Sequence, residues 1–198
     1  MGIFDSLKRQ AQQQLQQQVK NAVQSVASSA SATLRHSRVT LSALPRTLSE
    51  LQAMPEGKLQ SPQHTAALTV AALCLWSEDR EEAKAMLTYL AGPRGMTGQD
   101  WQFINDRFMD GRAYIPRSYF AGATVDNGYV PTVPYVLDMW DDPYTTEAGY
   151  AGVLLQSAGA DSKRKVILLQ KPSTGQWFLW QQELLSGIRV PKAEDPWA

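Results

Sequence analysis

A run of charged, aromatic and amide side chains lies between residues 106 and 129, and these residue types bind polar ligands or transfer protons. Asp106 and Asp110 stand four positions apart, the spacing that places two carboxylates on one face of a helix. Paired carboxylates can bind a divalent ion or perform acid–base chemistry, but we favour the interpretation that Asp110-Gly111 ends the helix and that Asp106 pairs with Arg112 or another cation. The candidate ligand-binding residues are Asp106, Arg107, Asp110, Arg112, Tyr114, Arg117, Tyr119, Asp126, Asn127 and Tyr129.

The same stretch is also typical of a structural crossover between two halves of a domain. Gly122 and Gly128 permit positive φ, and Pro131 and Pro134 favour extended chain before the next element. Its arginines and carboxylates would then form internal ion pairs. We favour the crossover, and a pocket in which these charged groups converge would favour the ligand site. The segment 157–165 has the same two interpretations.

The rest of the sequence contains no catalytic or metal-binding pattern. His36 and His64 are the only histidines and Cys74 is the only cysteine, which excludes a cysteine-based zinc cluster. On one helix, His64 and Cys74 would lie about 280° apart and would not converge. There is no G-x-S-x-G nucleophile pattern and no glycine-rich phosphate-binding pattern. We therefore expect no metal, no cofactor and no catalytic residue, although the sequence leaves open whether the protein is an enzyme.

Composition limits the class of protein. The chain has 198 residues, is 43% apolar and has a net charge of zero, which suits one domain with a core and an appendage. Five basic residues and one acidic residue in positions 1–40 give +4, so the remainder, with 14 basic and 18 acidic residues, carries −4. This distribution argues against nucleic-acid binding. No stretch reaches the about 18 apolar residues of a membrane span, and no signal peptide is visible. We expect a cytoplasmic protein.

Residues 1–38 are predicted to be a separate unit, in which a glutamine-rich amphipathic helix precedes a Ser/Ala-rich linker. An apolar stripe over residues 3–26 needs a surface, because an isolated helix has little stability in water. We expect self-association, including docking on the body. The alternative is the surface of the inner membrane, since Phe4 lies beside Lys8 and Arg9. The residues assigned to this helix surface are Ile3, Phe4, Leu7, Leu15, Val19, Val23 and Val26.

The body, residues 39–191, is predicted to be one α+β domain, followed by a C-terminal tail over 192–198. Capping residues predict that helices begin at Thr47, Ser61, Asp79 and Thr97. Residues 66–76 are apolar nearly all round, which predicts a helix buried on every side. Four strands are expected, within residues 133–142, 148–159, 163–171 and 176–185, and a PSTG turn joins the last two.

The last two predicted strands are apolar on both alternating faces, so both faces of their hairpin should be covered. The helices can cover one face. The other face requires the N-terminal helix, the irregular segment 112–134 or a second subunit. The sequence thus predicts a helical layer packed on a mainly antiparallel β-sheet, preceded by an amphipathic helix.

Long ordered blocks over about residues 41–191 resemble a bacterial protein family known only as a domain of unknown function. The resemblance implies a bacterial, cytoplasmic setting and supplies no activity and no catalytic residues. It also makes the FAGATVDNGY block part of the family pattern. The blocks that carry the resemblance are LPRTLSELQAMPEG, TAALTVAALCLW, MLTYLAGPRGM, FINDRFMDGRAYIPRSYFAGATVDNGYVP, SAGADSKRKVILL and QWFLWQQELLSGIRVP.

We therefore expect a non-enzymatic interaction or assembly protein. Its body would bind a protein partner, and its N-terminal helix would mediate self-association into a homo-oligomer. Two alternatives remain: an enzyme or small-ligand-binding domain that uses residues 106–129, and a peripheral membrane protein tethered through residues 1–26.

Overall fold

The most apolar segment of the chain forms the central helix of the computed structural model, which describes residues 34–197. This helix, α3 (Pro62–Cys74), begins after Ser61, whose hydroxyl accepts a hydrogen bond from the His64 backbone N–H. Every residue from 65 to 73 is buried, which confirms the prediction of a helix enclosed on all sides. Its two hydroxyls are satisfied, because Thr65 donates to the Trp177 carbonyl and Thr69 to the Thr65 carbonyl.

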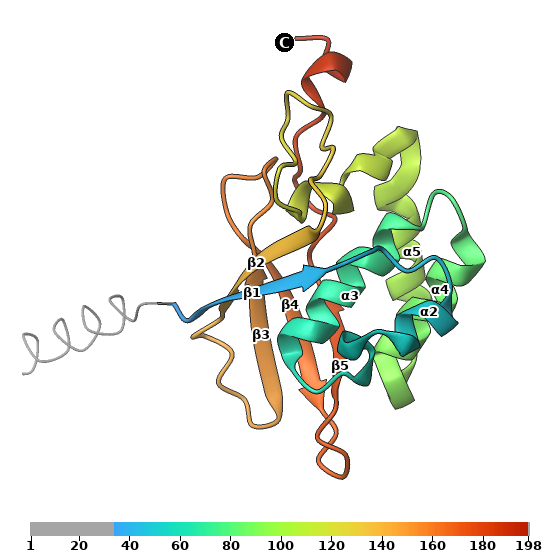
Figure 1. Cartoon of the computed structure of the whole chain (residues 1–198), viewed down its shortest axis with the longest axis vertical. Coiled ribbons are helices and arrows are strands. Elements are labelled where there is room, and N and C mark those ends of the chain that lie inside the picture. The colour runs from blue at the N-terminus through green and yellow to red at the C-terminus, as the bar shows by residue number, and fades with distance from the viewer. Residues whose placement is uncertain (1–33, 198) are drawn as a thin grey trace, which may run out of the picture. The chain divides into compact units, whose positions relative to one another are not determined.

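Three more α-helices of residues 34–197 lie to one side of α3, and α4 packs directly against it (Figure 1). The side chains of Thr47, Asp79 and Thr97 cap them by accepting backbone N–H groups three residues on, as their sequences predict. Single 3₁₀ turns connect several of the elements. The helices are α2 (Leu48–Ala53), α4 (Arg80–Ala91) and α5 (Gly98–Phe108).

Five antiparallel strands form one sheet in the order β1-β2-β3-β4-β5, so the α+β prediction is confirmed. The last four strands follow one another as a meander. Strand β1 precedes all the described helices in the chain and pairs with β2 at the edge of the sheet. The strands are β1 (His36–Leu41), β2 (Tyr135–Asp141), β3 (Tyr150–Leu155), β4 (Arg164–Gln170) and β5 (Trp177–Gln182).

Strand β1 is an element that the sequence does not reveal. Residues 36–38 were assigned to the linker by composition, yet they form the first half of this strand and pair with Asp138, Met139 and Trp140 of β2. The body of the protein thus begins a few residues earlier than expected. The helix that the sequence predicts over residues 1–26 lies outside the residues that the structure describes.

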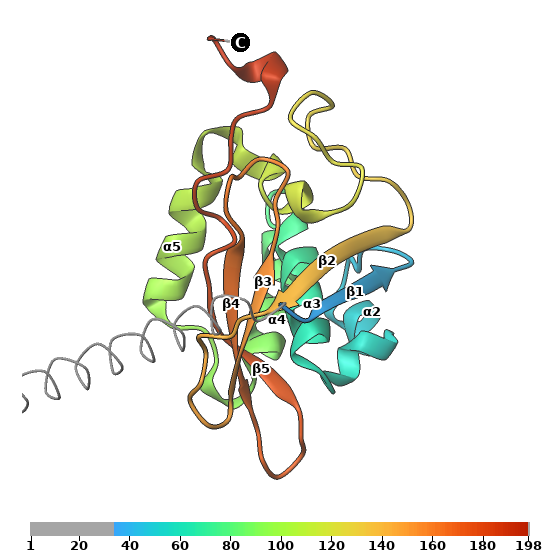
Figure 2. The ribbon, with the colours of Figure 1, turned by 90° about the vertical axis from the view of Figure 1, so that its left-hand side faces the viewer.

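The two faces of the sheet differ in what covers them. Leu137, Met139, Val153, Val166 and Leu168 point toward the helices and are buried. The alternate residues of the same strands point to the opposite face, which we call the open face, because α3 and α4 lie behind the sheet when this face is viewed (Figure 2). The irregular segment before β2, proposed above as a cover, packs at one end of the sheet instead.

The loop between β2 and β3 folds back onto the open face. Asp142, at its start, accepts hydrogen bonds from the Thr145 hydroxyl at 2.8 Å, the Tyr144 backbone N–H at 3.2 Å and the Lys165 ammonium at 3.2 Å. The loop approaches β3 at Gly152, where a Cβ would lie 2.6 Å from that of Asp142. A glycine is therefore required for this close approach.

The Asp142 carboxylate is 3% exposed, and this burial by itself raises its pKa. The hydrogen bonds from Thr145, Tyr144 and Lys165 outweigh the burial and hold the pKa below its ordinary value. A carboxyl with a depressed folded-state pKa stabilises the protein above its unfolded-state pKa, about 3.9. This stabilisation is lost as the pH falls through the folded-state value.

We predict that Asp142→Asn lowers the free energy of unfolding at neutral pH by about 1–3 kcal/mol, because a charged acceptor is lost. The difference from the parent protein should shrink as the pH falls from about 5 to about 2. Urea unfolding over this pH range measures both. Asp126→Asn, at an exposed carboxylate, is the control and should cost little. A difference between Asp142→Asn and the parent that stays constant with pH would contradict the prediction.

Candidate functional site

The segment that contains most of the sequence-predicted site residues is a crossover between α5 and β2. It includes two 3₁₀ turns, Met109–Tyr114 and Pro116–Tyr119, and an irregular stretch over residues 120–134. Helix α5 ends at Phe108, and Asp110 has φ of 58°. The favoured interpretation that Asp110-Gly111 ends the helix is confirmed. Asp106 and Asp110 therefore do not share a helix face, and Arg112 pairs with Asp110 instead of Asp106.

Asn127 holds the tightest part of the crossover. Its side-chain oxygen accepts the backbone N–H groups of Thr124 at 2.9 Å and Val130 at 3.1 Å. Its amide nitrogen donates to the carbonyls of Gly122 at 2.8 Å and Val130 at 3.0 Å. All four groups belong to the loop itself, so this side chain replaces a missing backbone ladder.

Buried hydroxyls attach the crossover to the sheet. Ser118 and Ser157, each 1% exposed, share a hydrogen bond of 2.7 Å between their hydroxyls. The Tyr119 hydroxyl donates to the Leu184 carbonyl, and burial raises its pKa. The Tyr129 hydroxyl donates to the Arg189 carbonyl. These side chains are therefore used in internal contacts.

The charged candidates do not converge on one point. The Asp110 carboxylate lies 3.7 Å from the Arg112 guanidinium, and the Asp126 carboxylate lies 3.2 Å from the Lys192 ammonium. The Arg107 guanidinium packs over the Phe103 ring at 5.1 Å. Among residues 34–197, no three His, Cys, Asp or Glu side chains gather in a way that could hold a metal ion.

The remaining candidate residues are either packed against other side chains or exposed to solvent. Tyr114 stacks on Tyr129, with ring centroids 5.5 Å apart. Asp106 is exposed on α5. Arg117 is exposed and, within the described chain, has no carboxylate within ion-pair distance. Asp106 likewise has no cation within ion-pair distance in residues 34–197, so the charges of both side chains face solvent.

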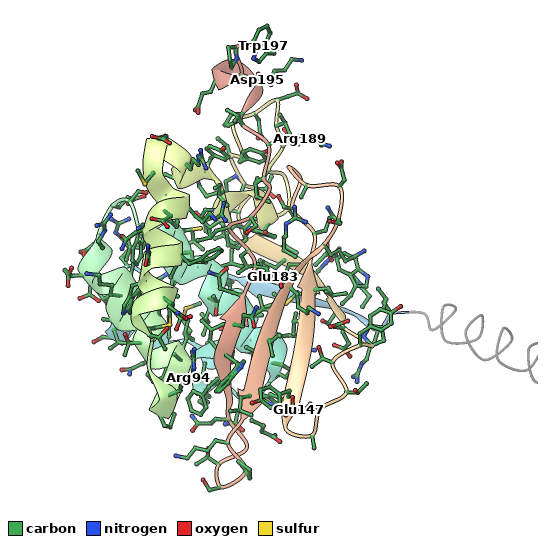
Figure 3. All side chains as sticks on the ribbon, turned by 180° about the vertical axis from the view of Figure 1, so that it is seen from behind. Arg94, Glu147, Glu183, Arg189, Asp195 and Trp197 are labelled. Carbon is green, nitrogen blue, oxygen red and sulfur yellow. The ribbon has the colours of Figure 1, made fainter. Side chains whose placement is uncertain are left out.

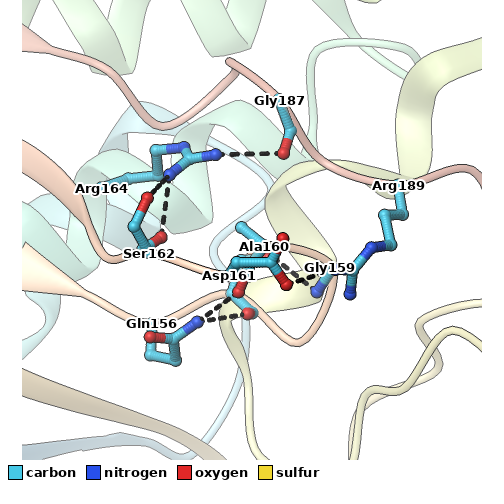
Figure 4. Close-up of polar contacts among 9 residues, drawn as sticks. Gln156, Gly159, Ala160, Asp161, Ser162, Arg164, Gly187 and Arg189 are labelled. Atoms are coloured by element: carbon cyan, nitrogen blue, oxygen red, sulfur yellow. Dashed lines mark hydrogen bonds and ion pairs between the residues drawn. The ribbon is translucent and has the colours of Figure 1, made fainter.

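The loop between β3 and β4 is also fixed by internal contacts (Figure 4). Arg164 donates to the carbonyls of Ser162, Ser186 and Gly187. Arg189 bonds the Asp161 carboxylate, and its backbone N–H donates to the Gly159 carbonyl at 2.9 Å. The 157–165 segment thus joins the sheet to the C-terminal chain.

A row of half-buried apolar side chains crosses the open face of the sheet, and sequence analysis did not locate it. Cross-strand pairs connect its members: Trp140 faces Leu154, and Tyr150 faces Leu169. At one end the Lys163 ammonium lies over Trp140 at 4.4 Å, and at the other the Tyr150 and Trp180 rings meet edge to face. We call it the apolar strip, and its residues are Trp140, Tyr150, Leu154, Ile167, Leu169 and Trp180.

The strip ends beside two hollows along β5, which Trp180 and Arg94 separate. The Arg94 guanidinium packs over the Trp180 ring at 4.8 Å and pairs with Asp100 at 3.2 Å. One hollow, of about 390 Å³, lies between α5 and β5. The other, of about 240 Å³, has an almost wholly apolar lining that includes Leu169 and Phe178. The strip thus continues into concave surface at the edge of the sheet.

A third hollow, of about 490 Å³, lies at the C-terminal end of α3. Cys74 and Arg117 line it, together with residues 42–46 and part of the crossover. Burial raises the pKa of Cys74 to about 12, although the nearby Arg117 lowers it slightly. A thiol with this pKa is almost wholly protonated at neutral pH and is therefore a poor nucleophile.

Comparison with protein families identifies the chain. Residues 43–192 match the model of the family described as "Domain of unknown function (DUF6935)". The chain belongs to this family. The match begins after β1 and runs from just before α2 to Lys192, including the crossover, and it agrees with the resemblance seen over residues 41–191. Comparisons with curated proteins and with solved structures found no match. In the described residues of this family member, no helix is both long and apolar enough to cross a membrane.

We predict that Asn127→Ala lowers the free energy of unfolding by about 1–2 kcal/mol, because two backbone N–H groups and two carbonyls lose their partner. Asp126→Ala is the matched control: it removes a neighbouring exposed side chain with one ion pair and should cost less than about 0.5 kcal/mol. Denaturant unfolding measures both variants. Equal losses in the two variants would show that Asn127 does not hold the crossover.

Proposed function

We propose that this protein is a non-enzymatic interaction protein, whose body binds a protein partner while its N-terminal segment mediates self-association. The apolar strip on the open face of the sheet is the single observation that carries the proposal. Its six side chains are partly exposed on one face of the sheet, and apolar surface with polar groups around it is typical of protein–protein contacts.

The composition of the strip favours a protein partner. Two tryptophans and a tyrosine lie in it, and these residue types are enriched at the energetic centres of interfaces. Its rim carries ion pairs, such as that of Arg38 with Asp138 at 2.9 Å, as the polar border of an interface does. Each member is already half-buried, so a partner would cover only its remaining exposed surface, which contributes about 25 cal/mol per Å² of apolar area.

Self-association is proposed for residues 1–26, which lie outside the described chain, on the basis of their sequence alone. The apolar stripe from Ile3 to Val26 extends over about 35 Å if the segment is helical. Glutamine on its polar face adds no charge that would oppose contact between two such helices. A bacterial, cytoplasmic setting is part of the proposal and is supported by the single cysteine of the chain.

We predict that removal of residues 1–33 lowers the solution mass of the protein, because the self-associating stripe is lost. Light scattering coupled to gel filtration measures the mass. The deleted segment ends before β1 at His36, so the sheet is retained. Binding to vesicles of anionic lipid is measured in parallel. An unchanged mass together with lost vesicle binding would favour a membrane function for the segment and contradict self-association.

We predict that Leu154→Gln weakens capture of the protein partner from native-cell extract about tenfold or more, because a polar group is placed within the strip, directly opposite Trp140. Thr40→Gln is the control, since Thr40 is exposed on the same face but outside the strip. Quantitative mass spectrometry of proteins retained by the immobilised full chain gives the result, and thermal melting verifies that both variants fold. Equal capture by both variants would show that the strip is not part of the binding surface.

A further inference from the structure

The C-terminal segment, residues 190–197, carries apolar and acidic groups away from the body (Figure 3). Trp197 is 93% exposed and Val190 is 43% exposed. Glu194 and Asp195 lie between them, and the Asp195 carboxylate accepts the Trp197 backbone N–H at 2.9 Å. A tryptophan at this exposure loses its hydrophobic contribution unless another surface covers it.

The base of this segment is fixed to the crossover of its own chain. The Lys192 backbone N–H donates to the Val125 carbonyl at 3.0 Å, and the Lys192 ammonium pairs with Asp126 at 3.2 Å. From this anchor the chain points outward (Figure 1), so Trp197 is presented to a second molecule.

A surface of matching chemistry exists on the same protein. The hollow of about 490 Å³ at the end of α3, which we call the Arg117 groove, has the size of a small-molecule site and room for an indole. Leu44, Pro45 and Val133 line it with apolar atoms, and Val133 is 70% exposed. An apolar ring can therefore be buried there against the exposed Val133 side chain and the half-buried Leu44.

The charges of groove and segment are complementary. Arg46, at the rim of the groove, already pairs with Glu78 at 3.0 Å. Arg117 is exposed without a carboxylate partner in residues 34–197. The groove thus carries one uncompensated positive charge beside an apolar floor, whereas the segment carries two carboxylates beside an exposed indole.

We propose that residues 190–197 of one copy dock in the Arg117 groove of a second copy. The Trp197 indole packs against the apolar lining, and the carboxylates of Glu194 and Asp195 face Arg117. This contact goes beyond the proposed function: it is a second association site, formed within the family domain and its C-terminal extension, and it does not require residues 1–33.

A labelled peptide of residues 187–198 tests this contact directly. Its receptor is the full chain with Trp197→Ala, whose own segment no longer competes. We expect saturable binding by fluorescence anisotropy. Replacement of tryptophan by alanine in the peptide should weaken binding about thirtyfold, as expected for the loss of an interfacial tryptophan.

Charge reversal locates the binding site. Addition of Arg117→Glu to the receptor should weaken binding about tenfold or more, and a peptide with Glu194→Lys and Asp195→Lys should restore it. Arg35→Glu is the control, because Arg35 is exposed at the opposite end of β1 and undergoes the same change of charge. Restoration by the reversed peptide also shows that the Arg117→Glu receptor is folded.

Two results would overturn the proposal. Equal binding to the Arg117→Glu and Arg35→Glu receptors would place the peptide outside the groove. Absence of binding to every receptor would assign Trp197 to a partner other than a second copy. Because the N-terminal segment is intact in all receptors and absent from the peptide, neither result bears on self-association through residues 1–26.

Discussion

Complete burial of α3 is the constraint on which the rest of the structure depends. A helix without a polar face must be covered all round, because each exposed apolar side chain would cost about 1.5–3 kcal/mol. Strands of the sheet cover one side of α3, and α4 and the crossover cover others. Thr65 and Thr69 are tolerated within it only because both hydroxyls bond backbone carbonyls. The long connection between β1 and β2 thus contains both α3 and part of the structure that covers it.

This arrangement leaves the second face of the sheet without a helical layer. In a sheet with one solvated face, alternate residues are polar. Here Ile167 and Leu169 of β4 point away from α3 yet are apolar. Both side chains are half-buried within residues 34–197, and Leu169 lines an apolar hollow beside the end of α4, yet no helix covers them. We therefore propose that a partner covers their remaining exposed surface, which is the reason to place the binding function on the open face.

The parts of the fold that could be predicted from the sequence are those governed by local chemistry. Capping side chains at Thr47, Ser61, Asp79 and Thr97 mark the starts of the four α-helices within residues 34–197, because a cap bonds a backbone group only three residues away. Strand β1 was missed because four of its six residues are polar and only Val39 and Leu41 reach the core. An edge strand needs little apolar character, so periodicity does not detect it.

The candidate site was predictable in composition but not in arrangement. The polar crossover was recognised, and its D-N-G turn is an Asx-type signal that identifies Asn127 as its centre. Whether its arginines meet its carboxylates depends on long-range folding: Asp126 bonds Lys192, 66 positions away along the chain. The apolar strip combines residues of four strands, and its position follows from sheet register, which sequence periodicity alone does not supply.

The proposed C-terminal contact explains why many hydrogen bonds hold the crossover in place. The crossover holds the base of the segment through Val125 and Asp126, and it lines the Arg117 groove through Pro131 and Val133. Donor and receptor surfaces thus lie on one element, so two copies related by a twofold axis can exchange segments reciprocally. Such an exchange closes at a dimer, whereas a one-way contact would continue into a ring or a filament. Reciprocity requires both surfaces to keep a fixed relative position, and the bonds of Asn127, Ser118 and Tyr119 supply that rigidity.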